Sequence, residues 1–150
     1  MNKLIIKTAV ATLVSILAAG IIALTVLTCF YPKTLADFNY KLGNDKLSVY
    51  YSELNYKKTG ELEDLEELIY KINNLDEYEK CVTYSQKMLE DEGFLEFSKD
   101  KEGYKLYVVS EYAVALTKTG LTNEESVERV KQYLEVDEVQ FVKTVLDNLK

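Results

Sequence analysis

Residues 8–31 read TAVATLVSILAAGIIALTVLTCFY, and this apolar stretch decides how the rest of the chain is placed. No charged side chain lies between Lys7 and Pro32. A helix over these residues is about 36 Å long, which is enough to cross a hydrocarbon core of about 30 Å with some tilt. We therefore predict a transmembrane helix over residues 8–31, which Pro32 ends at the membrane interface.

The predicted anchor divides the chain into four parts. A short tail, 1–7, precedes the transmembrane helix at 8–31, and a juxtamembrane segment, 32–45, connects it to an acidic helical domain at 46–150. Six apolar side chains spread along the helix are expected to contact the lipid bilayer: Val10, Leu13, Ile16, Ile21, Leu24 and Leu27.

Signal-sequence alternatives remain open for the same stretch. A cleaved secretory signal has an apolar region of about 7–15 residues, so the greater length here favours an uncleaved anchor. A lipoprotein signal needs a small residue before the lipidated cysteine, whereas Thr28 precedes Cys29. If either alternative holds, the mature chain is a secreted or lipid-anchored binding protein of a regulatory or immunity type.

The membrane orientation rests on the layout of the chain. Lysines flank the apolar stretch on both sides in similar numbers, so the positive-inside rule does not decide the orientation. A short tail followed at once by an apolar run is the layout of a signal-anchor. We expect the N-terminus inside and the acidic domain outside the cytoplasm.

Charge and composition exclude several functions. Two of the 18 basic residues and none of the 25 acidic ones lie before Pro32, which leaves residues 32–150 with a net charge of −9. Such a segment repels phosphate backbones, and Arg129 is its single arginine, so we expect no nucleic-acid binding. The absence of histidine excludes Ser-His-Asp and Cys-His catalysis and histidine-ligated zinc.

No constellation of residues points to catalysis, a cofactor or a metal, and we expect none of these. The acidic run between Glu61 and Glu67 lies at the start of a predicted helix, where the helix dipole favours carboxylates, and Glu67 can pair with Lys71. We interpret the run as a solvated helix face. Cys81 falls on an apolar stripe and is expected in the core.

Helical periodicity runs through the acidic domain, and glycines punctuate it. The first predicted helix ends at Gly60, and a later one ends at Gly120, after which Thr122 can cap the next. The predicted apolar stripes contain Leu47, Tyr50, Tyr51 and Leu54; Leu62, Leu65, Leu68, Ile69 and Ile72; Tyr78, Cys81, Val82, Ser85, Met88 and Leu89; Val108, Val109, Tyr112, Ala113 and Leu116; Val127, Val130, Tyr133 and Leu134; and Val139, Val142, Val145, Leu146 and Leu149. Short connections between them favour antiparallel neighbours.

Two features qualify a uniform helical pattern. Residues 58–60 and 118–120 both read Lys-Thr-Gly, which suggests two copies of a three-helix unit. The segment 94–107 is rich in aromatic residues on either side of a polar stretch, and it could form a short β-hairpin.

The helical pattern resembles a tetratricopeptide-repeat-like array. The segments that carry the resemblance are Tyr56-Lys57-Lys58-Thr59-Gly60-Glu61-Leu62 and the aromatic and small residues between Asp76 and Leu89. The resemblance implies an antiparallel helical repeat that binds other proteins. Leu65 and Ile69 stand where the family has small residues, so a plain helical bundle is the alternative.

Together these observations predict an all-α, single-pass membrane protein that serves as a protein-interaction module, either a scaffold or an assembly subunit. Among the 12 tyrosines, Tyr56 and Tyr70 fall outside the predicted stripes and are candidates for a partner-binding groove. A protein or peptide partner with basic residues would complement the acidic domain.

Overall fold

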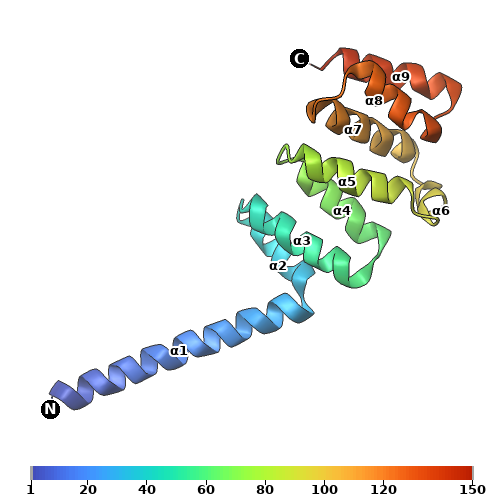
Figure 1. The fold of residues 1–150 in the computed structure, drawn as a ribbon. Coiled ribbons are helices and arrows are strands. Elements are labelled where there is room, and N and C mark those ends of the chain that lie inside the picture. The colour runs from blue at the N-terminus through green and yellow to red at the C-terminus, as the bar shows by residue number, and fades with distance from the viewer. Residues whose placement is uncertain (1, 150) are drawn as a thin grey trace. The chain divides into compact units, whose positions relative to one another are not determined.

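The computed structural model describes residues 2–149, and within this range the chain forms helices and no strand (Figure 1). In chain order these are α1 (Asn2–Phe30), α2 (Pro32–Lys41), α3 (Asp45–Thr59), α4 (Leu62–Asn73), α5 (Tyr78–Leu89), α6 (Phe94–Ser98), α7 (Tyr104–Lys118), α8 (Asn123–Val130), the 3-10 turn η1 (Lys131–Tyr133) and α9 (Val136–Asp147). The predicted all-helical class is confirmed. The chain divides into an N-terminal unit, Met1–Asn55, and a C-terminal unit, Tyr56–Lys150.

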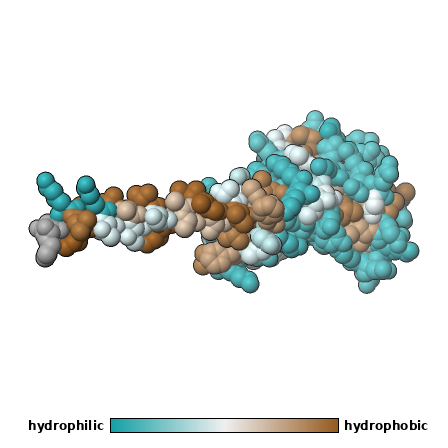
Figure 2. All heavy atoms as spheres, turned by 90° about the horizontal axis from the view of Figure 1, so that it is seen from below, coloured by the Kyte–Doolittle hydropathy of each residue, from teal (hydrophilic) through white to brown (hydrophobic). Residues whose placement is uncertain are grey.

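The first helix of the N-terminal unit is apolar along almost its whole length. Over Lys3–Phe30 it is long and apolar enough to cross a membrane, and none of its most apolar window is buried against protein. Figure 2 shows hydrophobic side chains along this helix. The helix already includes residues 2–7 and ends at Phe30, and Pro32 then occupies the first position of α2, where its missing N–H leaves no hydrogen bond unmade.

The buried face of α3 differs from the predicted stripe. We predicted that Leu47 and Tyr50 face the core, but both are exposed, and Ser48 and Val49 are buried instead. The hydroxyl of Ser48 donates a hydrogen bond to the carbonyl oxygen of Ala36 on α2 at 2.9 Å. The hydrogen bond buries the small polar side chain of Ser48 against α2, at a position that a stripe of large apolar residues does not predict.

The core of the C-terminal unit forms where α5 packs against α4 on one side and α7 on the other. The largest fully buried side chains of these helices and α8 lie on the predicted stripes: Leu65, Leu68, Ile72, Cys81, Met88, Val108, Val109, Tyr112 and Val130. The predicted helix ends are also confirmed. Gly60 and Gly120 adopt positive φ angles after α3 and α7, and Thr122 forms a capping box with Glu125 at the start of α8.

The predicted β-hairpin at 94–107 is wrong. Its first aromatic run forms α6 and its second begins α7, with the left-handed Gly103 immediately before α7. The aromatic residues recur at a helical spacing of three, as Phe94 and Phe97 and again as Tyr104 and Tyr107. Helix packing of these rings therefore outweighs the strand propensity of the individual residues.

Candidate functional site

All six predicted anchor side chains lie exposed on α1. They are Val10, Leu13, Ile16, Ile21, Leu24 and Leu27, and their exposed fractions range from 38% at Leu27 to 67% at Ile21. A continuous apolar surface on a helix of this length is unfavourable in water and favourable in hydrocarbon. The surface is thus suited to contact lipid along the whole helix.

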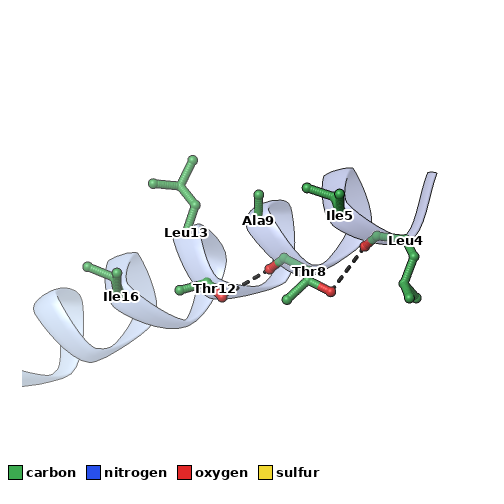
Figure 3. A pocket seen from close by; sticks show the side chains of 7 residues that line it. All are labelled: Leu4, Ile5, Thr8, Ala9, Thr12, Leu13 and Ile16. Carbon is green, nitrogen blue, oxygen red and sulfur yellow. Dashed lines mark hydrogen bonds between the residues drawn. The ribbon is translucent and has the colours of Figure 1, made fainter. Parts of the chain in front are cut away.

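The hydroxyl groups of α1 bond back to the helix itself. Thr8 and Thr12 donate to the carbonyl oxygens of Leu4 and Thr8, each at 3.0 Å (Figure 3), and Ser15 and Thr25 do the same one turn back. These hydroxyls therefore keep a partner where no water is present. The seven side chains drawn in Figure 3 line a hollow, and all of them belong to α1, so the hollow is a surface feature of one helix.

A cavity of about 380 Å³ lies between α4 and α7 in the C-terminal unit. Its wall is mostly apolar and is formed by three tyrosines, three glutamates and one isoleucine: Glu63, Glu66, Glu67, Ile69, Tyr70, Tyr104 and Tyr107. Helix α4 supplies the acids and α7 supplies two of the rings. The wall combines negative charge with aromatic faces, which together favour a cation.

Lys101 contacts two of the residues that line this cavity. Its Nζ atom donates to Oε2 of Glu66 at 2.6 Å, and it lies 4.9 Å from the centroid of the Tyr104 ring. The same atom is 3.7 Å from the centroid of Phe97, which comes from α6. The Lys101 ammonium group thus lies between a carboxylate and two aromatic faces, and it contacts the cavity through Glu66 and Tyr104.

The rings around Lys101 hold one another in place. Phe97 and Tyr104 meet edge to face with centroids 6.0 Å apart, and Tyr104 lies 6.3 Å from Phe94 and 6.2 Å from Tyr107. The Tyr104 hydroxyl also lies 3.6 Å from the sulfur of Met88 in the core. The ring faces offered to a cation are therefore anchored to the interior of the unit.

The phenols beside the cavity stay neutral at physiological pH. Burial, followed by the negative charge of Glu66, raises the pKa of Tyr104 above its ordinary value of 10.0. Burial and the charge of Glu111 raise the pKa of Tyr107. Neutral rings keep the negative quadrupole face that attracts cations, while the nearby carboxylates supply the net charge.

The two predicted groove tyrosines lie in different surroundings. Tyr70 is 53% exposed and lines the cavity. Tyr56 is buried, packs edge to face on Tyr84 with centroids 6.1 Å apart, and carries Lys87 over its ring at 4.8 Å. Sequence reasoning missed Phe97, Lys101 and Tyr104, because Lys101 lies in the non-helical connection between α6 and α7, where no periodicity marks its neighbours.

Cys81 lies in the core as predicted, but the predicted solvated face of the acidic run is only partly correct, because Asp64 is buried and accepts a hydrogen bond from the Thr59 hydroxyl at 2.7 Å. The predicted Glu67–Lys71 ion pair is present. Cys81 is 1% exposed, and burial raises the pKa of its thiol to about 11. Among the residues that the structure describes, no group of three or more carboxylate, cysteine or histidine side chains could hold a metal ion.

The chain was compared with models of protein families, with curated proteins and with solved structures, and none of them matched it.

Proposed function

We propose that this chain is a single-pass membrane-anchored protein-interaction module without catalytic activity. The observation that carries the proposal is the exposed apolar surface of α1 over Lys3–Phe30. At 1.5 Å per residue, these 28 residues extend about 42 Å, which exceeds the hydrocarbon thickness of about 30 Å. In the proposed orientation the N-terminus is cytoplasmic and the acidic helices lie outside the cytoplasm.

The partner in this proposal is a basic protein or peptide segment. Support comes from the net charge of −9 on residues 32–150 and from the carboxylates and rings between α4 and α7. Tethering to a membrane raises the effective concentration of the module toward partners on the same membrane, so a modest affinity suffices. Affinity should fall as salt rises, because screening weakens exposed charge pairs.

A divergent, tetratricopeptide-like helical repeat is the proposed architecture of the module. Support comes from matching lengths on either side of α6. Helices α3, α4 and α5 have 15, 12 and 12 residues, and α7 and α9 have 15 and 12, with the eight residues of α8 and the three of η1 between them. A plain helical bundle remains the alternative.

A second candidate function is that of a small secreted or lipid-anchored binding protein. The position of α1 near the N-terminus favours this second function, because a signal sequence is also an apolar helix near the N-terminus. In that case the apolar helix directs export and is then removed. Cys29 is exposed near the end of α1, where acylation would attach a lipid.

Protease protection combined with intact-mass analysis tests the proposal. The full chain carries a C-terminal tag and is expressed in intact cells. If the tag is digested from outside and the mass includes residues 1–31, the anchored, outward-facing module is supported. A protected tag on a membrane-bound chain overturns the orientation, and a mass without the apolar segment or with an added lipid supports the second candidate.

A further inference from the structure

We propose that the cavity between α4 and α7 binds a lysine side chain of a basic partner segment, and that Lys101 occupies the edge of this site until the partner displaces it. The inference rests on the proposed function, since it identifies the chemistry that the interaction module recognises. It adds a specific site and an internal competitor, neither of which follows from net charge alone.

The contacts of Lys101 identify the class of ligand. Its ammonium group is paired with the Glu66 carboxylate at 2.6 Å and lies 3.7 Å from the centroid of the Phe97 ring. A compact ammonium on a flexible stem fits a carboxylate on one side and ring faces on the other. The site already holds the functional group that we propose it binds.

The cavity is large enough to take a lysine side chain whose ammonium competes with Lys101 for Glu66. It extends for about 380 Å³ along α4 and α7, past Glu66 and Tyr104 to Tyr70 and Tyr107. The aliphatic stem of an incoming lysine can lie against Ile69 and the tyrosine rings while its ammonium reaches the carboxylates.

Lys101 is held in a way that permits exchange. The Lys101 and Glu66 side chains are 36% and 35% exposed, and half-exposed ion pairs are weak. Lys101 belongs to the connection between α6 and α7, so its side chain can leave without unfolding a helix. While Lys101 fills the site, a partner lysine cannot bind there. The apparent affinity for the partner is therefore reduced in proportion to the fraction of molecules whose site is open.

Binding of an octalysine peptide tests the proposal. The full chain is placed in nanodiscs of phosphatidylcholine, whose zwitterionic headgroups carry no net charge, and affinity for labelled octalysine is measured by fluorescence anisotropy at low salt. We expect Lys101→Met to raise the affinity about three- to tenfold relative to the control Lys99→Met. Both substitutions remove one positive charge, but Lys99 is an exposed residue paired with Glu96.

A second pair of variants tests the carboxylate in the background without the internal lysine. In Lys101→Met, the further change Glu66→Gln should lower affinity about fivefold or more, whereas Glu96→Gln should not. Zero-length carbodiimide crosslinking followed by mass spectrometry should join the peptide to Glu63, Glu66 or Glu67. Circular dichroism checks that every variant keeps the helical content of the parent.

The outcomes separate this inference from the function on which it rests. If octalysine does not bind at low salt, the proposed basic partner is wrong, and the lysine site falls with it. If octalysine binds but Lys101→Met and Lys99→Met are equal, or the crosslinks map to other carboxylates, the lysine site is overturned while a basic partner stands.

Discussion

The thiol of Cys81 donates a hydrogen bond to Oδ1 of Asn73 at 2.8 Å, and this partly buried contact joins α5 to α4 in the C-terminal unit. The amide nitrogen of Asn73 in turn donates to Oε2 of Glu111 on α7 at 3.1 Å. One amide side chain therefore connects three helices. Removal of the Asn73 amide takes one hydrogen bond from each partner in a partly desolvated position, and the Cys81 thiol keeps a 3.6 Å contact with the Ser85 hydroxyl.

Asn73→Ala should destabilise the C-terminal unit by about 1–3 kcal/mol, because it removes the amide donor of the Glu111 carboxylate and the acceptor of the Cys81 thiol. Urea unfolding of the full chain, followed by circular dichroism, measures the loss. Asn123→Ala is the matched control, since the Asn123 amide donates to Asp147 at 3.2 Å on the surface. Equal losses in the two variants would show that the buried bridge adds nothing beyond an exposed one.

Stability should depend on pH through Glu111. Burial raises its pKa above the ordinary value of 4.5, so the folded chain keeps this proton to higher pH than the unfolded chain. The free energy of unfolding should therefore fall as pH rises from about 4.5 through the raised pKa. Glu111→Gln should remove this decline, so its free energy of unfolding relative to the parent chain should be higher at pH 7 than at pH 4.5.

Glu125 provides the control of opposite sign. Hydrogen bonds from Thr122 lower the pKa of Glu125 below its ordinary value of 4.5. Its contribution to the free energy of unfolding is therefore present above pH 4.5 and is lost as pH falls through the lowered pKa. Glu125→Gln should cost stability at pH 7 and much less at pH 3.5. Urea midpoints at several pH values measure both variants, and parallel profiles for the two would contradict this assignment.

Cys81 should resist alkylation in the folded chain. With a thiol pKa of about 11, about one molecule in a thousand carries the thiolate at pH 8. The residue is also 1% exposed. Iodoacetamide labelling, mapped by mass spectrometry, should be at least about a hundredfold slower in buffer than in urea. Comparable rates would place Cys81 on an accessible surface.

Because α1 is apolar, a charged residue placed in its middle is the simplest test of whether the helix anchors the chain. Leu17→Arg should disfavour insertion by about 2.5–3.5 kcal/mol and reduce the fraction that stays with membranes in alkaline carbonate. Leu95→Arg is the control, because Leu95 is 71% exposed on α6 in the C-terminal unit and should tolerate the charge. Equal membrane retention of both variants would contradict a spanning helix.

Sequence periodicity predicted the fold best where large apolar side chains repeat. In α4, Leu65, Leu68 and Ile72 are buried as expected, because a strong stripe leaves one face for the core. In α3 the same reasoning selected Leu47 and Tyr50 and missed the buried face, since small polar residues such as Ser48 pack closely there. Hydrophobicity alone does not reveal such contacts.

The candidate site was less predictable than the core. Tyr70 was a candidate for a partner-binding groove because it falls outside the predicted α4 stripe, and in the structure it lines the cavity. Glu66 was interpreted only as part of a solvated face, and Lys101 as part of a turn. Their ion pair joins residues 35 positions apart, and that proximity depends on how α4, α6 and α7 pack. A pattern within one helix carries no information about it.

The four rings of Phe94, Phe97, Tyr104 and Tyr107 also provide an optical signal. The chain has no tryptophan, so tyrosine dominates its near-ultraviolet absorption. Tyrosines held in a fixed, asymmetric packing give near-ultraviolet circular dichroism that vanishes when the packing loosens. A lysine that enters or leaves beside Tyr104 changes the field at that chromophore, so the protein can report occupancy of its own site without a label.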